Sequence, residues 1–285
     1  MRKFIALFIF AAAFLQAQNH RFIYEYKFVS DSTQKDHSTS EMMFLDINKN
    51  GSKYYSREVY VQDSIMRADL EKQMKAGVSN FNIKRNDAKG KVRYKVTKDY
   101  TKNKTFFNTR IGTDSYKILE DRTLDWKILP EKQKIGSWEA QKATAEFAGR
   151  KWTAWFTEEL PFQDGPYKFR GLPGLIVKLE DATQSHVFEL KAVGKYKEEI
   201  QKVSEFVGTD KYIEVNQEQF KKIFLEDRND PAKSMKMAMA NGAVLQFRDQ
   251  NGNEISASEM IKRREQQVKE NNKRDNNLLE LDLLQ

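Results

Sequence analysis

The sequence predicts a mainly β protein, a β-rich α+β fold built on a curved antiparallel sheet that is sandwich-like or barrel-like. Three observations support this class. Short runs of alternating apolar residues, rich in aromatic and β-branched side chains, recur through the first two thirds of the chain. Turn-forming Gly, Asn and Pro residues separate these runs. Helical patterns are confined to one short insertion and to the C-terminal third.

Period-two patterns indicate the strands. Apolar and aromatic residues at every second position of 21–29 fall on one face, which is typical of a half-buried strand. Asn50 and Gly51 separate the runs 42–47 and 53–61, and Asn-Gly between two apolar runs predicts a β-hairpin. The remaining predicted strands are 92–96, 104–111, 116–121, 138–147, 151–157, 175–180, 186–193 and 243–247.

Capping patterns indicate the helices. A short inserted helix is predicted over 63–76, because polar capping residues begin it and Gly77 can end it. A second helix is predicted over 216–227, and a charged third helix over 256–272 begins with a Ser-x-x-Glu capping box. We therefore expect 216–285 to be partly helical, with a mobile end.

The N-terminus has the layout of a secretory signal peptide. Arg2 and Lys3 precede the apolar run 4–15, and small and polar residues follow. The run is about half the roughly 20 residues that a transmembrane helix needs, and no later run is longer. We expect 1–18 to be cleaved and 19–285 to form a single domain without a membrane span. The alternative, a signal anchor, is disfavoured by length.

Composition narrows the class of protein. There is no cysteine, so the chain has neither the lipobox cysteine of a lipoprotein nor a disulfide bond. The formal net charge of +8 falls to about +6 without Arg2 and Lys3. Because charges of both signs are interleaved, the sequence does not show the clustered Lys and Arg of a nucleic-acid surface. We expect a periplasmic or outer-membrane-associated protein that is not a lipoprotein.

No catalytic, metal or cofactor motif is evident. The three histidines are scattered, and no metal-ligand spacing, nucleophile elbow or phosphate-binding loop is present. The segment 46–51 matches the first half of an EF-hand loop, but Arg57 occupies the position of the bidentate glutamate. We therefore predict no enzyme, no bound metal and no cofactor.

Three residues are candidates for binding a ligand or a partner. Trp155 lies on the opposite strand face from its aromatic neighbours, so it is predicted to line a groove or to meet a partner. Tyr167 is a neighbouring aromatic candidate. Arg170 is the charged residue next to the most distinctive motif, so it is the candidate contact for an anion; the alternative is a surface salt bridge.

That motif is the hexapeptide Gly171, Leu172, Pro173, Gly174, Leu175 and Ile176. Pro173-Gly174 predicts a type II turn with positive φ at Gly174, followed by a buried strand from Leu175 onward. None of its side chains is nucleophilic or acid–base active. We therefore interpret the motif as structural.

The hexapeptide resembles the signature of the GLPGLI family. Other matching positions are Trp126, Ile135-Gly136, Lys142-Ala143-Thr144, Gly149-Arg150, Thr153-Ala154-Trp155-Phe156-Thr157, Gly165-Pro166 and Leu278-Leu279-Glu280-Leu281. Ala140 replaces a cysteine that members often carry, so a shared disulfide or thiol role is in doubt here. The resemblance implies an exported protein of Bacteroidetes-type bacteria without an established activity. It also implies an outer-membrane TonB-dependent receptor, or another envelope protein, as partner.

Three functions remain open from the sequence. The first is a periplasmic or outer-membrane-facing binding or accessory protein, which an apolar cavity would favour. The second is a structural or assembly partner without a small ligand, which an exposed aromatic patch would favour. The third is an unrecognised hydrolase, which a cleft with paired carboxylates of shifted pKa would favour.

Overall fold

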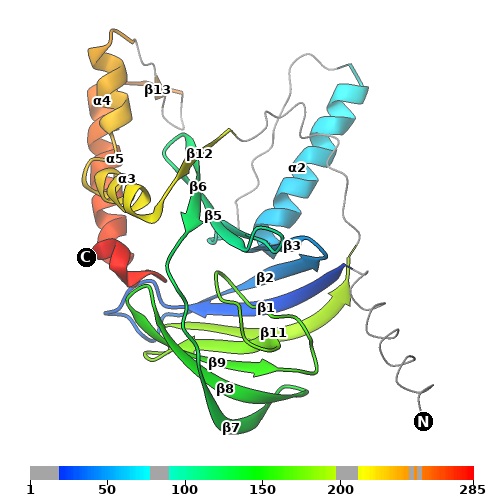
Figure 1. Ribbon diagram of the computed structural model, residues 1–285. Coiled ribbons are helices and arrows are strands. Elements are labelled where there is room, and N and C mark those ends of the chain that lie inside the picture. Colours follow the sequence, from blue (N-terminus) through cyan, green and yellow to red (C-terminus); the bar gives the residue numbers. More distant parts are fainter. Residues whose placement is uncertain (1–18, 78–89, 197–210, 244–246, 249–251) are drawn as a thin grey trace, which may run out of the picture.

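The computed structural model describes residues 19–77, 90–196, 211–243, 247–248 and 252–285. The predicted signal peptide and most of the strand predicted over 243–247 lie outside these residues. The protein is mainly β, as predicted. Twelve strands form one curved, mostly antiparallel sheet in the order β12-β6-β5-β4-β3-β2-β1-β11-β10-β9-β8-β7. The sheet stays open, so it is neither a closed barrel nor a sandwich (Figure 1).

The strands of this sheet are β1 (His20–Phe28), β2 (Thr39–Asn48), β3 (Gly51–Ser56), β4 (Lys95–Asp99), β5 (Lys104–Ile111), β6 (Asp114–Glu120), β7 (Lys127–Ile135), β8 (Trp138–Phe147), β9 (Arg150–Thr157), β10 (Leu175–Asp181), β11 (His186–Lys195) and β12 (Tyr212–Val215). A separate pair is β13 (Phe247–Arg248) and β14 (Glu254–Ile255). The helices are α2 (Arg57–Lys75), α3 (Gln217–Asn229), α4 (Lys233–Ala240), α5 (Ala257–Arg274) and the 3₁₀ turn η2 (Leu281–Leu284).

The structure corrects several predicted boundaries. The strand predicted over 53–61 ends at Ser56, whose hydroxyl accepts a hydrogen bond from the amide of Val59 at 3.1 Å and caps α2. The inserted helix therefore begins earlier than 63 and is 19 residues long. The strand predicted over 92–96 is shifted to β4, and the amide of Val92 donates to the side chain of Glu41 instead of joining a strand ladder.

Two strands of the large sheet are absent from the predicted set. β7 is an edge strand whose residues are mostly exposed, so its sequence lacks an alternating apolar face. It contains Pro130. Proline has no backbone N–H to donate to a neighbouring strand, and an edge strand tolerates this because one of its sides has no neighbour. β12 is four residues long and pairs with β6 in parallel, so the sheet is not purely antiparallel.

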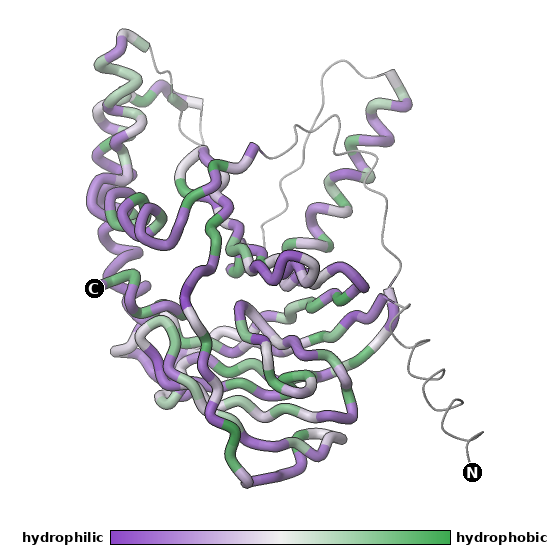
Figure 2. The backbone as a smooth tube through the Cα atoms, in the orientation of Figure 1, coloured by the Kyte–Doolittle hydropathy of each residue, from purple (hydrophilic) through white to green (hydrophobic). Residues whose placement is uncertain are grey.

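The concave side of the sheet is filled by the connection between β9 and β10, residues 158–174, which we call the signature loop. Phe162 packs its ring 5.2 Å from that of Phe22 on β1. Phe169 is fully buried in the main core. Just after the loop, the carbonyl of Ile176 on β10 accepts a hydrogen bond from Tyr24 at 2.7 Å. The loop is therefore part of the core, and Figure 2 shows hydrophobic and hydrophilic residues alternating along the strands of the sheet.

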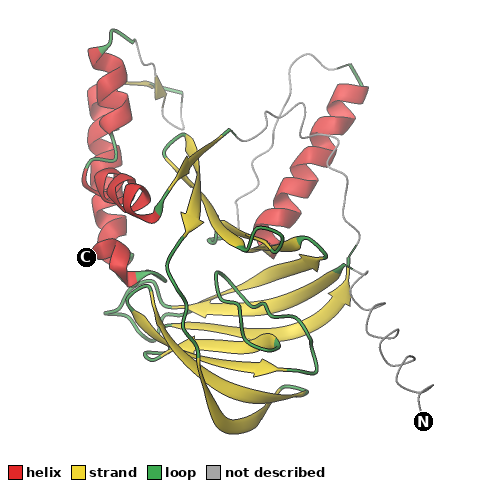
Figure 3. Cartoon of the chain, viewed as in Figure 1, coloured by secondary structure: helices red, strands yellow, loops and turns green. Residues whose placement is uncertain are grey.

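The helices lie apart from this core. α2 leaves the sheet at β3 and has no buried residue, while α3, α4 and α5 lie on the other side of the molecule (Figure 3). In the parts of the chain described above, no helix is long and apolar enough to cross a membrane. Only Phe220 of α3 is buried among the residues of α3, α4 and α5, where it packs with Tyr116 and Ile118 of β6.

The C-terminal end, expected to be mobile, packs against the sheet. The amide of Leu281 donates a hydrogen bond to the carbonyl of Ala148 in the β8–β9 turn at 2.9 Å. Asn277 donates through its side chain to the carbonyl of Val29 at 2.8 Å. Glu280 is only 4% exposed. The apolar residues before the terminus therefore complete the edge of the core.

Candidate ligand groove

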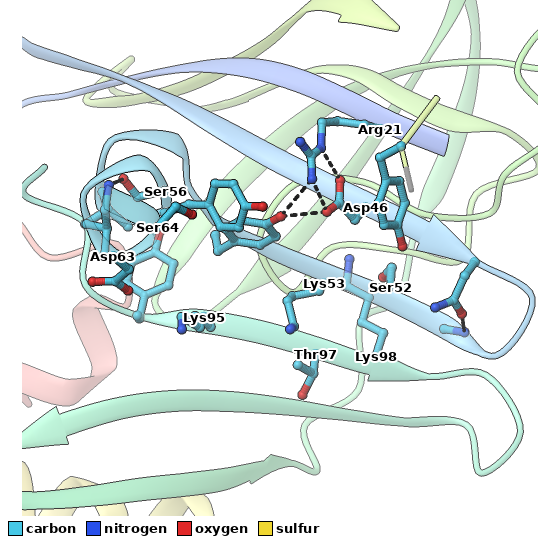
Figure 4. Close-up of a pocket in the computed structure, with 18 of the residues that line it drawn as sticks. Arg21, Asp46, Ser52, Lys53, Ser56, Asp63, Ser64, Lys95, Thr97 and Lys98 are labelled. Carbon is cyan, nitrogen blue, oxygen red and sulfur yellow. Dashed lines mark hydrogen bonds and ion pairs between the residues drawn. The ribbon is translucent and has the colours of Figure 1, made fainter. Parts of the chain in front are cut away.

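An open groove of about 1080 Å³ lies between α2 and strands β1 to β4 (Figure 4). Its helical wall includes Asp63, Ser64 and Arg67 of α2. Its floor includes Lys53 of β3 and Lys95 of β4. The groove lies on the face of the sheet opposite the core residues of these strands, since Tyr54 and Val96, their sequence neighbours, are fully buried.

A buried carboxylate fixes the helical wall against the floor. Glu41 of β2 is 5% exposed and accepts a hydrogen bond from the hydroxyl of Ser56, the residue that caps α2. Its other oxygen accepts from the amides of Lys91 and Val92, at 2.7 and 3.1 Å. One side chain thus positions both the start of α2 and the segment that enters β4.

A second buried carboxylate holds the end of the groove at β1. Arg21 binds Asp46 through two hydrogen bonds of 2.7 and 2.8 Å, and Tyr55 donates to the same carboxylate at 2.6 Å. Hydrogen bonding to Asp46 raises the pKa of Arg21 further above its ordinary value. Burial raises the pKa of Tyr55. The cluster is satisfied internally, so it supports the floor and leaves recognition to other residues.

The cations and acids of the groove differ in how they are paired. Within the described ranges, the side chains of Arg67, Arg93 and Lys95 have no hydrogen-bond or ion-pair partner. Of the four described acids that line the groove, three are engaged: Asp46 by Arg21, Asp99 by the turn at Thr101, and Glu71 by Lys75. Asp63 is the remaining acid. The groove therefore offers a local excess of positive charge that suits an anion.

Lys98 connects the groove to the signature loop. Its side chain is 1% exposed, and its ammonium donates to Asp164 and to the carbonyls of Gly165 and Phe169, at 2.8 and 3.0 Å for the carbonyls. Tyr100 also donates to Asp164. Burial lowers the pKa of Lys98. The ion pair fixes the loop to β4, the strand that forms the floor of the groove.

The hexapeptide has a different geometry from the predicted type II turn. The amide of Gly174 donates to the carbonyl of Leu172 at 2.8 Å, so Pro173 is the centre of a three-residue turn. The positive φ of 95° belongs to Gly171, and Gly174 is not in that region. A Cβ on Gly174 would lie 2.1 Å from the carbonyl oxygen of Thr157. Glycine is needed there because two backbone segments meet.

The three predicted binding residues do not meet in the groove. Trp155 is 8% exposed, and Tyr167 is 2% exposed with its hydroxyl 2.5 Å from Glu280. Arg170 is partly exposed and donates to the side chain of Asn103. None of the three lines the groove. Their role in binding remains a prediction.

A buried charged cluster beneath the loop gave no sequence signal. Lys168 pairs with Glu120 of β6 at 2.7 Å and with Glu280 near the C-terminus, and Arg122 lies 2.6 Å from Glu120 and 2.9 Å from Glu280. Burial by itself raises the pKa of Glu280, but the charges of Lys168 and Arg122 hold it below its usual range. The same cations lower the pKa of Glu120 against the effect of burial.

A second buried cluster surrounds His186, one of the three histidines that are scattered in the sequence. Its ring nitrogens lie 2.8 Å from the hydroxyl of Tyr26 and 3.0 Å from the carbonyl of Asn277. Arg150 pairs with Asp181 at 2.9 Å beside it. Burial lowers the pKa of His186 to about 4, so the imidazole is neutral at physiological pH.

The EF-hand-like segment forms the predicted hairpin. Asn48 pairs with Gly51 where β2 turns into β3, and the carboxylate of Asp46 is used by Arg21 and Tyr55. Across the described residues, no group of three or more His, Asp or Glu side chains is arranged to hold a metal ion. The segment therefore acts as a turn.

Comparison with known proteins adds a family match and a fold likeness. A family described as "Protein of unknown function (Porph_ging)" matches residues 146–178, which include β9 and the hexapeptide. No curated protein matches the chain. Two solved structures of PNGF-II, in space groups P21 and C2, are similar with TM-scores of 0.48 and 0.49 and 15% identity. The match covers 74% of this chain and 34% of theirs, so the chain spans about a third of their length.

Proposed function

We propose that this chain is an exported binding protein of the cell envelope, periplasmic or outer-membrane-facing, whose groove between α2 and β1–β4 holds an anionic ligand. One observation carries the proposal: among the described residues, the side chains of Arg67, Arg93 and Lys95 lie in the groove without partners, while three of its four acids are engaged. A cation left without a partner beside a concave surface is available to a bound anion.

Catalysis is less well supported by the same geometry. The closely paired carboxylates of Glu120 and Glu280 are buried and share Lys168, away from the groove. Their lowered pKa values keep both ionised at neutral pH, so neither can act as a general acid there. The family match and the likeness to PNGF-II give no positive evidence of an enzymatic activity.

The envelope location rests on the N-terminal segment and on the resemblance to the GLPGLI family. Mass spectrometry of the N-terminus of the native protein should find a chain that begins at Gln18 or Asn19. An intact Met1 on protein from the cytosol would contradict export. A TonB-dependent outer-membrane receptor is the recipient that the resemblance suggests for the bound ligand.

The binding proposal is tested with two fluorescein-labelled polyanions, octaglutamate and a heparin octasaccharide, by fluorescence anisotropy. At least one should bind, and its affinity should fall as salt is raised. Lys95→Glu should weaken binding by roughly tenfold, since it reverses a charge on the floor. The matched control is Lys132→Glu, an exposed lysine of β7 with the same charge change. Failure of both probes to bind, or equal effects of the two variants, would refute the proposal.

An assembly role is the second candidate, because α2 carries exposed apolar side chains. Val61, Ile65 and Met66 are 41%, 57% and 37% exposed, and none of them lines the groove. If α2 docks onto another envelope protein, Ile65→Ser should reduce recovery of that partner after crosslinking in cells. The same change should leave polyanion binding unaltered.

A further inference from the structure

The floor of the groove is the face of paired strands, which limits how a ligand can be held. β2, β3 and β4 each have hydrogen-bonded neighbours on both sides, so their backbone groups are engaged within the sheet. The edges of the twelve-stranded sheet are β12 and β7, and neither contributes to the groove. A peptide that adds a strand therefore has no edge to pair with here.

The side chains that line the groove suit a ligand rich in hydroxyl groups. They include the hydroxyls of Ser64 on α2, Tyr60 on α2 and Thr97 on β4. The hydroxyl of Thr97 accepts a hydrogen bond from Asn108 at 3.2 Å, which leaves its proton available for donation. Hydroxyl side chains both donate and accept, and so do the hydroxyls of a sugar.

The cations are distributed over the helical wall of the groove and its floor. Arg67 belongs to the helix, Lys95 to β4, and Arg93 to the segment that enters β4. A ligand that meets all three must carry more than one negative group along its length. The groove volume of about 1080 Å³ slightly exceeds the roughly 300–1,000 Å³ usual for small-molecule sites, which favours an oligomer over a single sugar.

We infer that the groove binds an acidic oligosaccharide, whose carboxylate or sulfate groups meet Arg67, Arg93 and Lys95 and whose hydroxyls meet the hydroxyl side chains of the groove. This inference rests on the proposed function and specifies its ligand. It separates the ligand from an acidic peptide, which carries the charge but lacks the hydroxyls.

Isothermal titration with four octamers tests the inference: octagalacturonate, a heparin octasaccharide, maltooctaose and octaglutamate. At least one acidic oligosaccharide should bind about tenfold or more tightly than both maltooctaose and octaglutamate. Comparing the two acidic sugars identifies carboxylate or sulfate as the preferred group. If octaglutamate binds as tightly as the sugars, the groove is a site for polyanions and this inference fails, while the proposed function stands. If none binds, both fail.

Two variants locate the contacts. Lys95→Ala should weaken binding of the acidic sugar by several-fold, and the control Lys132→Ala should not. Thr97→Val keeps the side-chain shape and removes the hydroxyl, so it should weaken sugar binding and leave any residual octaglutamate binding unchanged. Thermal melts that match the wild type show that the variants are folded. An unchanged sugar affinity in Lys95→Ala and Thr97→Val would overturn the assignment to this groove.

Discussion

The charged residues under the signature loop and those of the groove illustrate two uses of charge in one sheet. The side chains of Lys98 and Lys168 are 1% and 2% exposed; Lys98 pairs with the carboxylate of Asp164, and Lys168 pairs with those of Glu120 and Glu280. Lys95 lies three positions before Lys98 on β4, hence on the opposite face; its side chain is partly exposed and has no partner within the described ranges. A buried charge without a partner is costly, so Lys98 and Lys168 must keep their carboxylate partners for the fold to be stable. An exposed charge such as that of Lys95 costs little without a partner, so it is available to bind a ligand.

The largest expected loss of stability comes from breaking the buried pair of Lys98 and Asp164. Asp164→Ala leaves the ammonium of Lys98 buried with only carbonyl partners, so it should reduce the free energy of unfolding by about 3–5 kcal/mol. The measurement is urea unfolding. Lys98→Met combined with Asp164→Leu should cost less than Asp164→Ala alone, because no uncompensated charge remains. A cost below about 1 kcal/mol for Asp164→Ala would contradict the structural role of the pair.

The cluster around His186 should make stability depend on pH. The pKa of His186 is about 4 in the folded protein and about 6.5 in the unfolded chain. The folded state therefore favours the neutral ring. The contribution of the neutral ring to the free energy of unfolding is complete above pH 6.5 and is lost as the pH falls toward 4. The loss is on the order of 3 kcal/mol. In His186→Gln, the urea midpoint of unfolding should depend less on pH across this range than in the wild type. The control His37→Gln, at an exposed site, should keep the wild-type profile.

The two glycines of the hexapeptide should respond differently to substitution. Gly174→Val places a Cβ against the backbone of Thr157, so it should cost about 1–3 kcal/mol and more than Gly174→Ala. Gly171→Ala meets open space, and its cost comes only from the positive φ of 95°. Thermal midpoints compare the three. If Gly174→Val melts like the wild type and abolishes ligand or partner binding, the loop is a recognition element and our structural interpretation is wrong.

Arg170 should contribute little to stability. Its partner Asn103 is neutral and the contact is exposed, so Arg170→Ala should change the free energy of unfolding by about 0–1 kcal/mol. Thermal melts check this. A loss of partner binding with an unchanged melt would support the predicted role of Arg170 as a contact for an anion.

The smallest expected effect on stability belongs to the groove. Lys95→Ala should stay within about 0.5 kcal/mol of the wild type in urea unfolding, since no partner in the described chain is lost. A cost as large as that of Asp164→Ala would remove the distinction between the two regions.

The sequence predicted the strands where local pattern and burial coincide. β1 alternates along its whole length because one face lies on the core, and the hairpin at Asn50-Gly51 follows from local turn chemistry. β7 was missed because an exposed edge strand needs no alternation. The strand that begins at Leu175 was predicted correctly, but the turn before it depends on the contact between Gly174 and Thr157, which only the folded chain creates.

The candidate groove had no signal in the sequence. Arg67 and Lys95 are 28 positions apart and look like ordinary surface charges until α2 and β4 come together. The buried clusters were hidden for the same reason: Lys168 meets Glu120 and Glu280 from distant segments. Charge pairing at long sequence separation leaves no periodicity to detect.

The position of Glu280 has a consequence for how the chain folds. β1 pairs with β11. Tyr167 forms a hydrogen bond and Lys168 an ion pair with Glu280, and the amide of Leu281 donates to the carbonyl of Ala148. The native contacts are thus of long range in sequence, which slows folding. During synthesis β1 and β2 can pair early, but β11, the second neighbour of β1, is made only after more than half of the remaining chain. The unpaired edge of β1 is therefore exposed to aggregation in that interval, and a holding chaperone that binds extended, apolar segments would protect the nascent chain.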